Sequence, residues 1–274
     1  MRRKFPTITW RDRIFRTVFL EATTIVVWLF GIVLVAWQKP AIQTLSESTP
    51  HVVTDPYSWI FAFATALTII IICYQRKWFG NLIAVILGVL LISGLLLFVG
   101  NVFALIIAIG FVWFERTHRS YLSNNALLLT AILFGTLPIV ARLDINTVIL
   151  ALAALSLYDV LGVFASRLIP TLALGAVTSY IPLLLLEPRA NVSWKSAPTL
   201  TNTSAIIGSG DIFLPAIMIG VVTLTTGIPS GLITLLGAIV GWMLNTLLAT
   251  VIKTGIPALP LLSAGMIIAY QLSR

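Results

Sequence analysis

The stretch that decides the fold is Gly208-Ser209-Gly210-Asp211-Ile212-Phe213-Leu214-Pro215, which opens an apolar run that continues to Thr226. This run places the carboxylate of Asp211 inside a segment with the character of a membrane span. An ionised carboxylate in hydrocarbon is costly, so an acid at such a position predicts a functional site. A second acid, Asp159, lies in another apolar run, within Ser156-Leu157-Tyr158-Asp159-Val160-Leu161. We therefore predict that Asp159 and Asp211 form one catalytic pair inside the bilayer.

The composition of the chain indicates an integral membrane protein. Of its 274 residues, 59% are hydrophobic and only 9% are charged, whereas a soluble domain carries about 25% charged residues. The apolar runs are long and do not alternate, so they predict helices rather than the strands of a barrel. The net charge of +8 first reports topology in a membrane protein, and no nucleic-acid partner is predicted. A single cysteine, Cys73, excludes an internal disulfide.

Nine membrane-spanning helices can be drawn along the chain, with lengths near the ~20 residues that cross a ~30 Å hydrocarbon core. We predict an all-α polytopic membrane protein with one transmembrane domain over residues 1–274. Helices 1–6 occupy about 17–165, a cytoplasmic loop about 166–204, and helices 7–9 about 205–272. The nine predicted ranges are Thr17–Trp37, Tyr57–Tyr74, Trp78–Val99, Val102–Phe114, Asn125–Ala141, Ile145–Ala165, Ala205–Thr226, Pro229–Val251 and Pro257–Leu272.

The positions of Lys and Arg predict the orientation. With a cytoplasmic N-terminus, 14 of the 17 basic residues fall in cytoplasmic segments, and only Lys39, Arg142 and Arg274 fall outside. Such a bias marks the cytoplasmic side, so we predict the N-terminus inside and the C-terminus outside. Counting the apolar run 170–186 as a tenth span would scatter these charges. We predict instead that it lies near the cytoplasmic interface, is strand-like over Tyr180–Leu186, and is followed by a polar, flexible loop over 187–202.

The same topology places the two acids at equal depth. Each lies about six residues from the cytoplasmic end of its predicted span, which at 1.5 Å per residue is roughly 9 Å. Two carboxyl groups that lie close together in a low dielectric do not both ionise, and the pair shares a proton. The ionised member then takes a proton from water, while the neutral member polarises a peptide carbonyl. Which aspartate plays which part is left open.

Residues around Asp211 fit this chemistry. Gly208 is three residues before the acid, so we predict that both lie on one helical face and that Gly208 permits close approach of another backbone. Gly210 is predicted to loosen the helix. Pro215 cannot donate to the carbonyl of Asp211, which predicts a kink or a free acceptor. Free backbone at this depth requires protein or a water-filled cavity beside it, and hydrolysis requires that water.

Two further features accompany the acids. Pro257-Ala258-Leu259-Pro260 enters the last span with two missing donors and two fixed φ angles. We predict a rigid, non-helical wall of the active site there. Tyr158, beside the first acid, is predicted either to hydrogen-bond the pair or simply to pack.

Taken together, these residues resemble the YD, GxGD and PAL motifs of the presenilin and signal peptide peptidase family of intramembrane aspartyl proteases. Tyr158-Asp159, Gly208-Ser209-Gly210-Asp211 and Pro257-Ala258-Leu259 match in order and in placement, on the sixth, seventh and ninth spans. The resemblance implies a nine-helix presenilin-like fold, with Asp159 and Asp211 catalytic and the Pro257–Leu259 segment shaping the site and substrate access. It also implies a compact microbial homologue in the presenilin orientation, with substrates whose C-terminus is cytoplasmic.

The expected partners are transmembrane helical peptides or proteins as substrates and the lipid bilayer of a cell membrane. Accessory subunits are not expected to be required, and a homo-oligomer is left open. Because helical backbone is already hydrogen-bonded, a substrate must unwind, and we hypothesise that it pairs with the strand-like Ile181–Leu186. Glu21 is predicted to extend its carboxylate to the interface, and Asn245 to hydrogen-bond between helices.

Other activities fit the sequence less well. No HExxH motif or carboxylate–histidine cluster indicates a metal, no motif indicates a cofactor, and Ser209 lacks an intramembrane histidine partner. A prepilin-type peptidase also uses a GxGD acid, but nine spans and Pro257-Ala258-Leu259 argue against it. The remaining alternative is a proton- or cation-coupled transporter that uses Asp159 and Asp211 as relay groups. Such a transporter should show inverted repeats and paired broken helices, and neither is evident.

Overall fold

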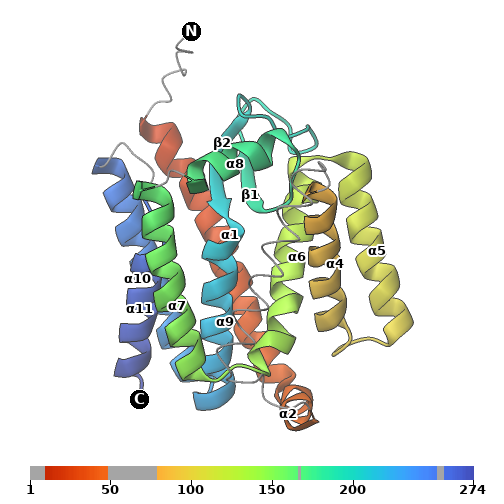
Figure 1. The fold of residues 1–274 in the computed structure, drawn as a ribbon, viewed down its shortest axis with the longest axis vertical. Coiled ribbons are helices and arrows are strands. Elements are labelled where there is room, and N and C mark those ends of the chain that lie inside the picture. The colour runs from red at the N-terminus through yellow and green to blue at the C-terminus, as the bar shows by residue number, and fades with distance from the viewer. Residues whose placement is uncertain (1–9, 49–78, 166–167, 252–255) are drawn as a thin grey trace.

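Helices run side by side along one axis of the structure (Figure 1), a computed structural model that describes residues 10–48, 79–165, 168–251 and 256–274. Eight of the nine predicted spans coincide with a described helix, and the predicted span Tyr57–Tyr74 lies outside the described residues. These eight helices are α1 (Trp10–Trp37), α4 (Phe79–Leu95), α5 (Asn101–His118), α6 (Tyr121–Val140), α7 (Ile145–Val160), α9 (Ser209–Thr226), α10 (Ile228–Val251) and α11 (Leu259–Leu272).

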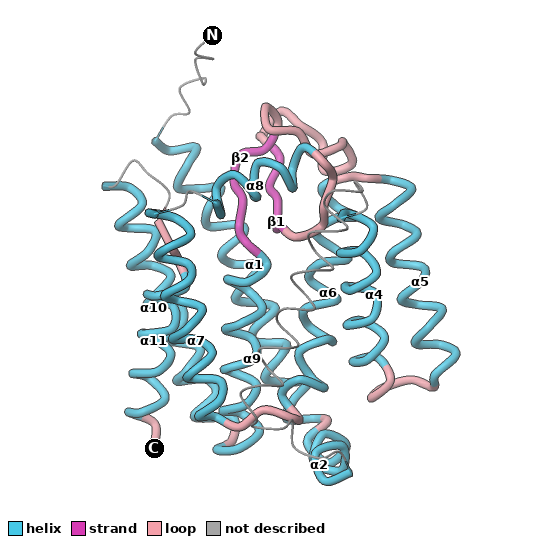
Figure 2. The backbone as a smooth tube through the Cα atoms, viewed as in Figure 1, coloured by secondary structure: helices cyan, strands magenta, loops and turns pink. Residues whose placement is uncertain are grey.

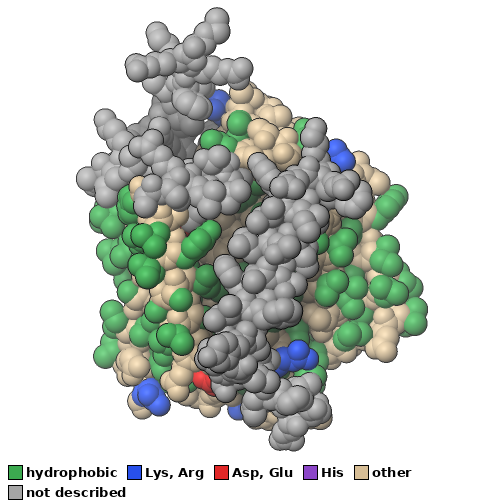
Figure 3. Space-filling view, in the orientation of Figure 1, with side chains coloured by type: hydrophobic (Ala, Val, Ile, Leu, Met, Phe, Trp, Pro, Cys, Tyr) green, Lys and Arg blue, Asp and Glu red, His purple; other side chains and the backbone are tan. Residues whose placement is uncertain are grey.

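Several of these helices have the length and composition of membrane spans. Five contain an apolar stretch long enough to cross a bilayer. On the face shown in Figure 3, hydrophobic side chains gather on both flanks at mid-height, and Lys and Arg side chains lie towards the two ends of the molecule. The protein is therefore an integral membrane protein. The five stretches are Leu20–Trp37, Tyr121–Val140, Ile145–Phe164, Ser209–Thr226 and Ile228–Ala249, and α4 and α11 are shorter apolar helices.

Two short helices lie outside this set. Helix α2 (Lys39–Ser48) follows α1, and α8 (Leu168–Thr178) lies across one end of the bundle rather than along it (Figure 1). With 11 residues, α8 is too short to span a bilayer. The apolar run 170–186 therefore begins as a helix at the end of the bundle, and it contributes no further parallel helix.

A small sheet joins the end of the otherwise helical bundle, and its first strand overlaps the stretch Tyr180–Leu186 that was predicted to be strand-like. Strands β1 (Leu184–Pro188) and β2 (Thr203–Gly208) pair antiparallel, with Leu186 opposite Ile206 and Leu184 opposite Gly208. Figure 2 shows β2 leading directly into α9. The predicted helix start at Ala205 is wrong, because residues 205–208 are strand and α9 begins at Ser209. A short apolar run does not by itself distinguish a strand from a buried helix.

The outward edge of β1 is covered by side chains of α6. The Leu186 N–H donates to Asn125 Oδ1 (3.0 Å), and Asn125 Nδ2 donates to the Leu186 carbonyl (2.7 Å). Asn124 Nδ2 donates to the Leu184 carbonyl (2.8 Å). An unpaired buried backbone group is costly, so these amides let β1 lie fully buried. Substrate pairing was hypothesised for Ile181–Leu186, and the free edge of β1 within this stretch is therefore already occupied by side chains of α6.

The loop between the strands is anchored as well. Although we predicted flexibility over 187–202, the N–H groups of Tyr121 and Leu122 donate to carbonyls of this loop, at Ser196 and Trp194 (3.2 and 3.0 Å). The first N–H groups of a helix have no intrahelical acceptor, so the loop caps α6. The Tyr121 hydroxyl also contacts Thr203 Oγ1 of β2 (3.0 Å).

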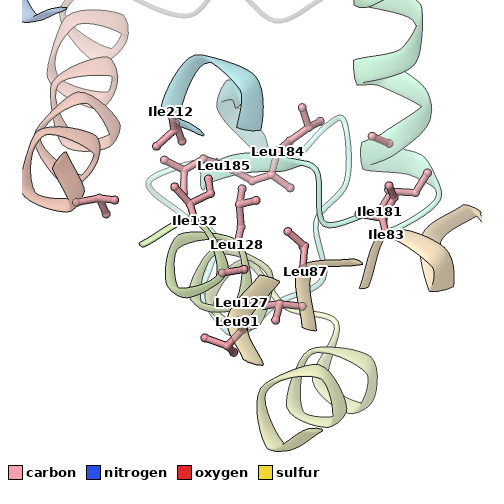
Figure 4. Close-up of a cluster of buried hydrophobic side chains, with 14 of the residues drawn as sticks. Ile83, Leu87, Leu91, Leu127, Leu128, Ile132, Ile181, Leu184, Leu185 and Ile212 are labelled. Carbon is pink, nitrogen blue, oxygen red and sulfur yellow. The ribbon is translucent and has the colours of Figure 1, made fainter. Parts of the chain in front are cut away.

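One hydrophobic core connects the sheet to the helices. Leu184 and Leu185 of β1 pack among side chains of α4, α6 and the first turn of α9 (Figure 4). Leu185 and Ile212 are both 0% exposed. Because Ile212 follows Asp211 directly, this core fixes the start of α9 against the sheet. The labelled members are Ile83, Leu87, Leu91, Leu127, Leu128, Ile132, Ile181, Leu184, Leu185 and Ile212.

Helices α10 and α11 pack through glycines. A Cβ on Gly237 would lie 2.3 Å from the Gly265 carbonyl oxygen, and one on Gly241 would lie 2.4 Å from the Leu261 carbonyl oxygen. Only glycine permits such backbone contact, as in other small-residue helix interfaces. The glycine pair therefore sets the position of α11 and of its N-terminus.

Helix α7, which carries Asp159, begins at a side-chain cap. Asp144 accepts hydrogen bonds from the Thr147 N–H (2.9 Å) and the Thr147 hydroxyl (2.6 Å). The Thr147 hydroxyl and N–H hold the pKa of the exposed Asp144 carboxyl below its usual range. The cap satisfies one of the free N–H groups at the start of the helix.

Gly241→Ala should destabilise the protein by about 1–3 kcal/mol, because the added methyl meets backbone that cannot rotate away. The measurement is thermal unfolding in detergent. Gly110→Ala is the matched control, since nothing lies within 4 Å of its Cβ position and alanine is the better helix former. Equal midpoints for the two variants would contradict the packing argument.

Asn125→Leu should destabilise the protein by about 1–3 kcal/mol for each backbone group of Leu186 that loses its partner in a buried site. Unfolding midpoints can be compared with those of Asn146→Leu, which changes an exposed asparagine. A variant at position 125 that is as stable as the control would show that the edge of β1 does not depend on this amide.

Candidate active site

Asp159 lies near the end of α7, shortly before a π-helical turn, η1 (Leu161–Ala165). Its carboxylate is partly buried and its Oδ2 accepts a hydrogen bond from the Leu259 N–H (3.2 Å). The Ala258 N–H also hydrogen-bonds this carboxylate. Single π-helical turns are frequent at functional sites, and this one begins two residues after the acid.

The Pro257–Leu259 segment supplies these donors because it is the start of a helix. Pro257 and Ala258 are non-helical, and Leu259 is the first residue of α11, with Pro260 next to it. The first N–H groups of a helix have no acceptor within the helix, so that of Leu259 is free to bind a carboxylate. The predicted break is therefore present, and the structure brings it together with Asp159.

A second contact ties α7 to α11 beside the acid. The hydroxyls of Ser156 and Ser263 lie 3.1 Å apart. Ser156 is three residues before Asp159, so it lies one turn along the same face of α7. The position of Asp159 therefore depends on α11 through both backbone and side-chain contacts.

Asp211 is the third residue of α9, and its carboxylate folds back onto the residue that precedes the helix. Gly208 caps the helix in an extended conformation (φ −68°, ψ 141°), and its backbone hydrogen-bonds the Asp211 carboxylate. A Cβ on Gly208 would lie 3.2 Å from Oδ2 of Asp211. The prediction that Gly208 shares a helical face with Asp211 is wrong, and the group that approaches Gly208 closely is the acid itself.

The two acids come from helices in direct contact. Helices α7 and α9 pack together, and α11 contacts both. The two carboxyl groups lie close enough that a charge on one would act on the other. A helix N-terminus carries a partial positive charge. Asp159 lies at the N-terminus of α11, and Asp211 lies in the first turn of α9.

The other predicted site residues contribute less visibly. Tyr158 is 53% exposed, and among the described residues no hydrogen bond joins its hydroxyl to either acid. Gly210 is exposed in the first turn of α9, with open space at its Cβ position. Pro215 lies inside α9, as expected. Roles for Tyr158 and Gly210 in shaping the site stay predictions.

Two polar residues within the apolar runs have defined surroundings. Glu21, which was expected to reach the interface, accepts a hydrogen bond from the Thr246 hydroxyl of α10 (2.7 Å). Asn245 was expected to bond between helices, yet its buried Oδ1 has no partner in the part of the chain that the structure describes. In that same part, no three His, Cys, Asp or Glu side chains are grouped as a metal site would require.

One contact of the site was not foreseen. The indole N–H of Trp28, on α1, donates to the carbonyl of Ile212 at 2.9 Å. The two residues are 184 positions apart in the chain, and nothing in the local sequence of α1 marks Trp28 among the eight tryptophans.

Comparison with known proteins agrees with this arrangement. The family profile described as signal-peptide peptidase, presenilin aspartyl protease matches residues 21–273. Crystal structures of a presenilin family intramembrane aspartate protease share the fold. The structure in space group C222 has a TM-score of 0.60 at 17% identity, covering 94% of this chain and 98% of that one. The structure in space group P2 has a TM-score of 0.61 at 15% identity, covering 91% and 95%.

A search of curated proteins gave no match. The family match nevertheless extends over nearly the whole chain and includes both acids and the Pro257–Leu259 segment. The chain therefore belongs to the signal-peptide peptidase and presenilin family of intramembrane aspartyl proteases.

Proposed function

We propose that Asp159 and Asp211 together activate a water molecule that hydrolyses peptide bonds within the transmembrane segments of membrane proteins. One observation carries the proposal. The two acids lie on packed helices, and each carboxylate accepts a backbone hydrogen bond from the start of a helix, Asp159 from Leu259 and Asp211 from Gly208. Such donors orient carboxyl groups without introducing a positive side chain, so the pair can still hold a single proton.

The reaction then follows ordinary aspartic-protease chemistry. The ionised carboxylate takes a proton from water, whose oxygen attacks the peptide carbonyl carbon, and the protonated carboxyl gives its proton to the carbonyl oxygen. The tetrahedral diol collapses when the carboxyl that is now protonated gives its proton to the amide nitrogen, the other carboxylate takes a proton from a hydroxyl of the diol, and the C–N bond breaks. The products are a carboxylic acid and an amine, and the pair returns to its singly protonated state.

The outward edge of β2 is the surface that we propose for the unwound substrate. In an antiparallel pair, residues whose backbone groups point away from each other alternate with those that bond. Because the backbone of Leu186 bonds Asn125, its opposite residue, Ile206, directs its N–H and carbonyl outward. Gly208 is in the same phase as Ile206, and its backbone bonds the Asp211 carboxylate. A strand added along this edge would run towards the acids.

The wider topology forms part of the proposal. We include nine spans, a cytoplasmic N-terminus and an external C-terminus. This topology explains why most basic residues fall on one side of the membrane. It also fits the positions of the start of α1 and of the C-terminus, which lie at opposite ends of the bundle (Figure 1). We further propose a multi-pass protein of a cell membrane, acting on substrates with a cytoplasmic C-terminus and without an obligatory accessory subunit.

Asp159→Asn and Asp211→Asn should each lower the cleavage rate of a single-span substrate by at least about 10²–10⁴-fold, the range that proton transfer by a positioned group contributes. Purified protein in detergent, with products identified by mass spectrometry, provides the measurement. Both amides keep the size of the acid, so matched thermal unfolding would exclude misfolding.

The same preparations also test the transporter alternative. Wild-type protein in liposomes should carry no proton or cation flux. Flux that depends on Asp159 and Asp211, in a protein that cleaves nothing, would replace the protease proposal with a transporter.

Ile206→Pro should slow cleavage of a membrane-spanning substrate by about tenfold or more, because it removes the outward N–H of β2. Ile206→Ala, which keeps the N–H but shortens the partly exposed side chain, is the control. A short peptide that is already unfolded offers a second readout. If the proline variant cleaves the membrane-spanning substrate as fast as the alanine variant does, substrate pairing on this edge is wrong.

A further inference from the structure

Trp28 makes a single polar contact beside Asp211. Its side chain is 1% exposed, and its indole N–H donates to the Ile212 carbonyl at 2.9 Å. This carbonyl belongs to the residue that follows Asp211 in the first turn of α9. A buried indole usually finds a hydrogen-bond partner. Here that partner is a backbone group of another helix, one residue from an acid of the site.

The first turn of α9 is deficient in internal hydrogen bonds at this point. Within an α-helix, the carbonyl of Asp211 would accept from the N–H of residue 215. That residue is Pro215, which has no N–H and whose ring crowds the carbonyl four residues earlier. The backbone at Asp211 is therefore less restrained by its own helix. A donor from α1 onto the next carbonyl restrains it from outside.

Trp28 is itself held in place. Its ring meets that of Trp242, on α10, edge to face, with centroids 5.5 Å apart and planes at 61°. Two turns away on the same face of α1, Glu21 is hydrogen-bonded by Trp242 and Thr246. Helix α1 is thus fastened to α10 on one side and to the backbone of α9 on the other, so the indole N–H has little freedom to move.

Taking the protease activity proposed above as given, we propose that Trp28 is a positioning residue for that reaction. Its N–H fixes the peptide group between Ile212 and Phe213, one residue beyond Asp211, and this restraint on the first turn of α9 sets the direction of the Asp211 side chain relative to Asp159. Trp28 does not touch the reacting atoms. Its effect is on the geometry of the pair, which matters most in the transition state, where both carboxyl groups exchange protons with the substrate.

Trp28→Phe tests this role, because it keeps an aromatic ring and removes the donor. We expect kcat to fall about tenfold with KM unchanged, because the variant loses the hydrogen bond to the Ile212 carbonyl, which orients the acid and does not bind substrate. The affinity for a hydroxyl-containing transition-state isostere should fall by a similar factor. Replacement of Trp28 by benzothienylalanine, in which sulfur takes the place of the N–H, should give the same result with the ring shape preserved.

Thr223→Val is the matched control. Thr223 is buried, and its hydroxyl also donates to a carbonyl of α9, that of Ile219 at 2.8 Å, but it lies 12 residues beyond Asp211. This variant should lose stability comparably with Trp28→Phe, as measured by thermal unfolding, and keep kcat within about twofold. A general loosening of α9 would lower kcat in both.

Three results would overturn the proposal. They are an equal loss of kcat in Trp28→Phe and Thr223→Val, a change in KM alone, or a benzothienylalanine enzyme with wild-type kcat. Failure of the underlying activity is distinguished by the same assay. In that case the wild-type protein shows no cleavage that depends on Asp159 and Asp211, and the protease proposal itself fails.

Discussion

A carboxylate inside a helical bundle needs hydrogen-bond donors, and almost all backbone N–H groups of a helix are already used within it. This constraint governs the site. The exceptions are the first N–H groups of each helix, and both acids use them. Asp159 bonds the start of α11, and Asp211 bonds the residue that caps α9. The breaks in helical structure around Gly208 and Pro257 are therefore the means by which the protein places charge at depth.

The other contacts of the fold can be understood as supports for those two helix starts. Glycine packing between α10 and α11 fixes the start of α11 through close backbone contact. The start of α9 is fixed by the sheet, by the core around Leu185 and Ile212, and by the bond from Trp28. The edge of β1 that faces away from β2 is in turn covered by Asn125. Precise placement of two side chains thus draws on residues from most of the described elements.

Much of this arrangement could be predicted from the sequence, because it follows from local signals. Apolar runs predicted eight helices that are present, and two prolines predicted the break before α11. The aspartates stood out because charge is rare in such runs. By contrast, the strand over 203–208 could not be separated from the helix that follows, since Ala205, Ile206 and Ile207 suit either structure. The mistaken helical placement of Gly208 followed from that boundary error.

Contacts between distant segments left no local signal. Nothing near Trp28 indicates that its N–H reaches α9, and nothing near Asn125 indicates that it covers a strand edge, because each partner lies far away in the chain. The bond between Thr246 and Glu21 was not predicted, for the same reason. A side chain that could reach the interface was found bonded to Thr246, 225 positions later in the chain. Periodicity and composition describe which surfaces are apolar, but not which polar atoms meet.

Asp159 and Leu259 are synthesised at different times, so their contact can form only late in synthesis. The acid on α7 enters the membrane during synthesis well before its donors, which lie about 100 residues later at the start of α11. Until α11 has inserted and docked on α10, the carboxylate lacks the backbone groups that orient it. Under the proposed mechanism, a nascent chain thus carries both acids before the donors of Asp159 are in place, and cleavage would begin only after α11 has docked.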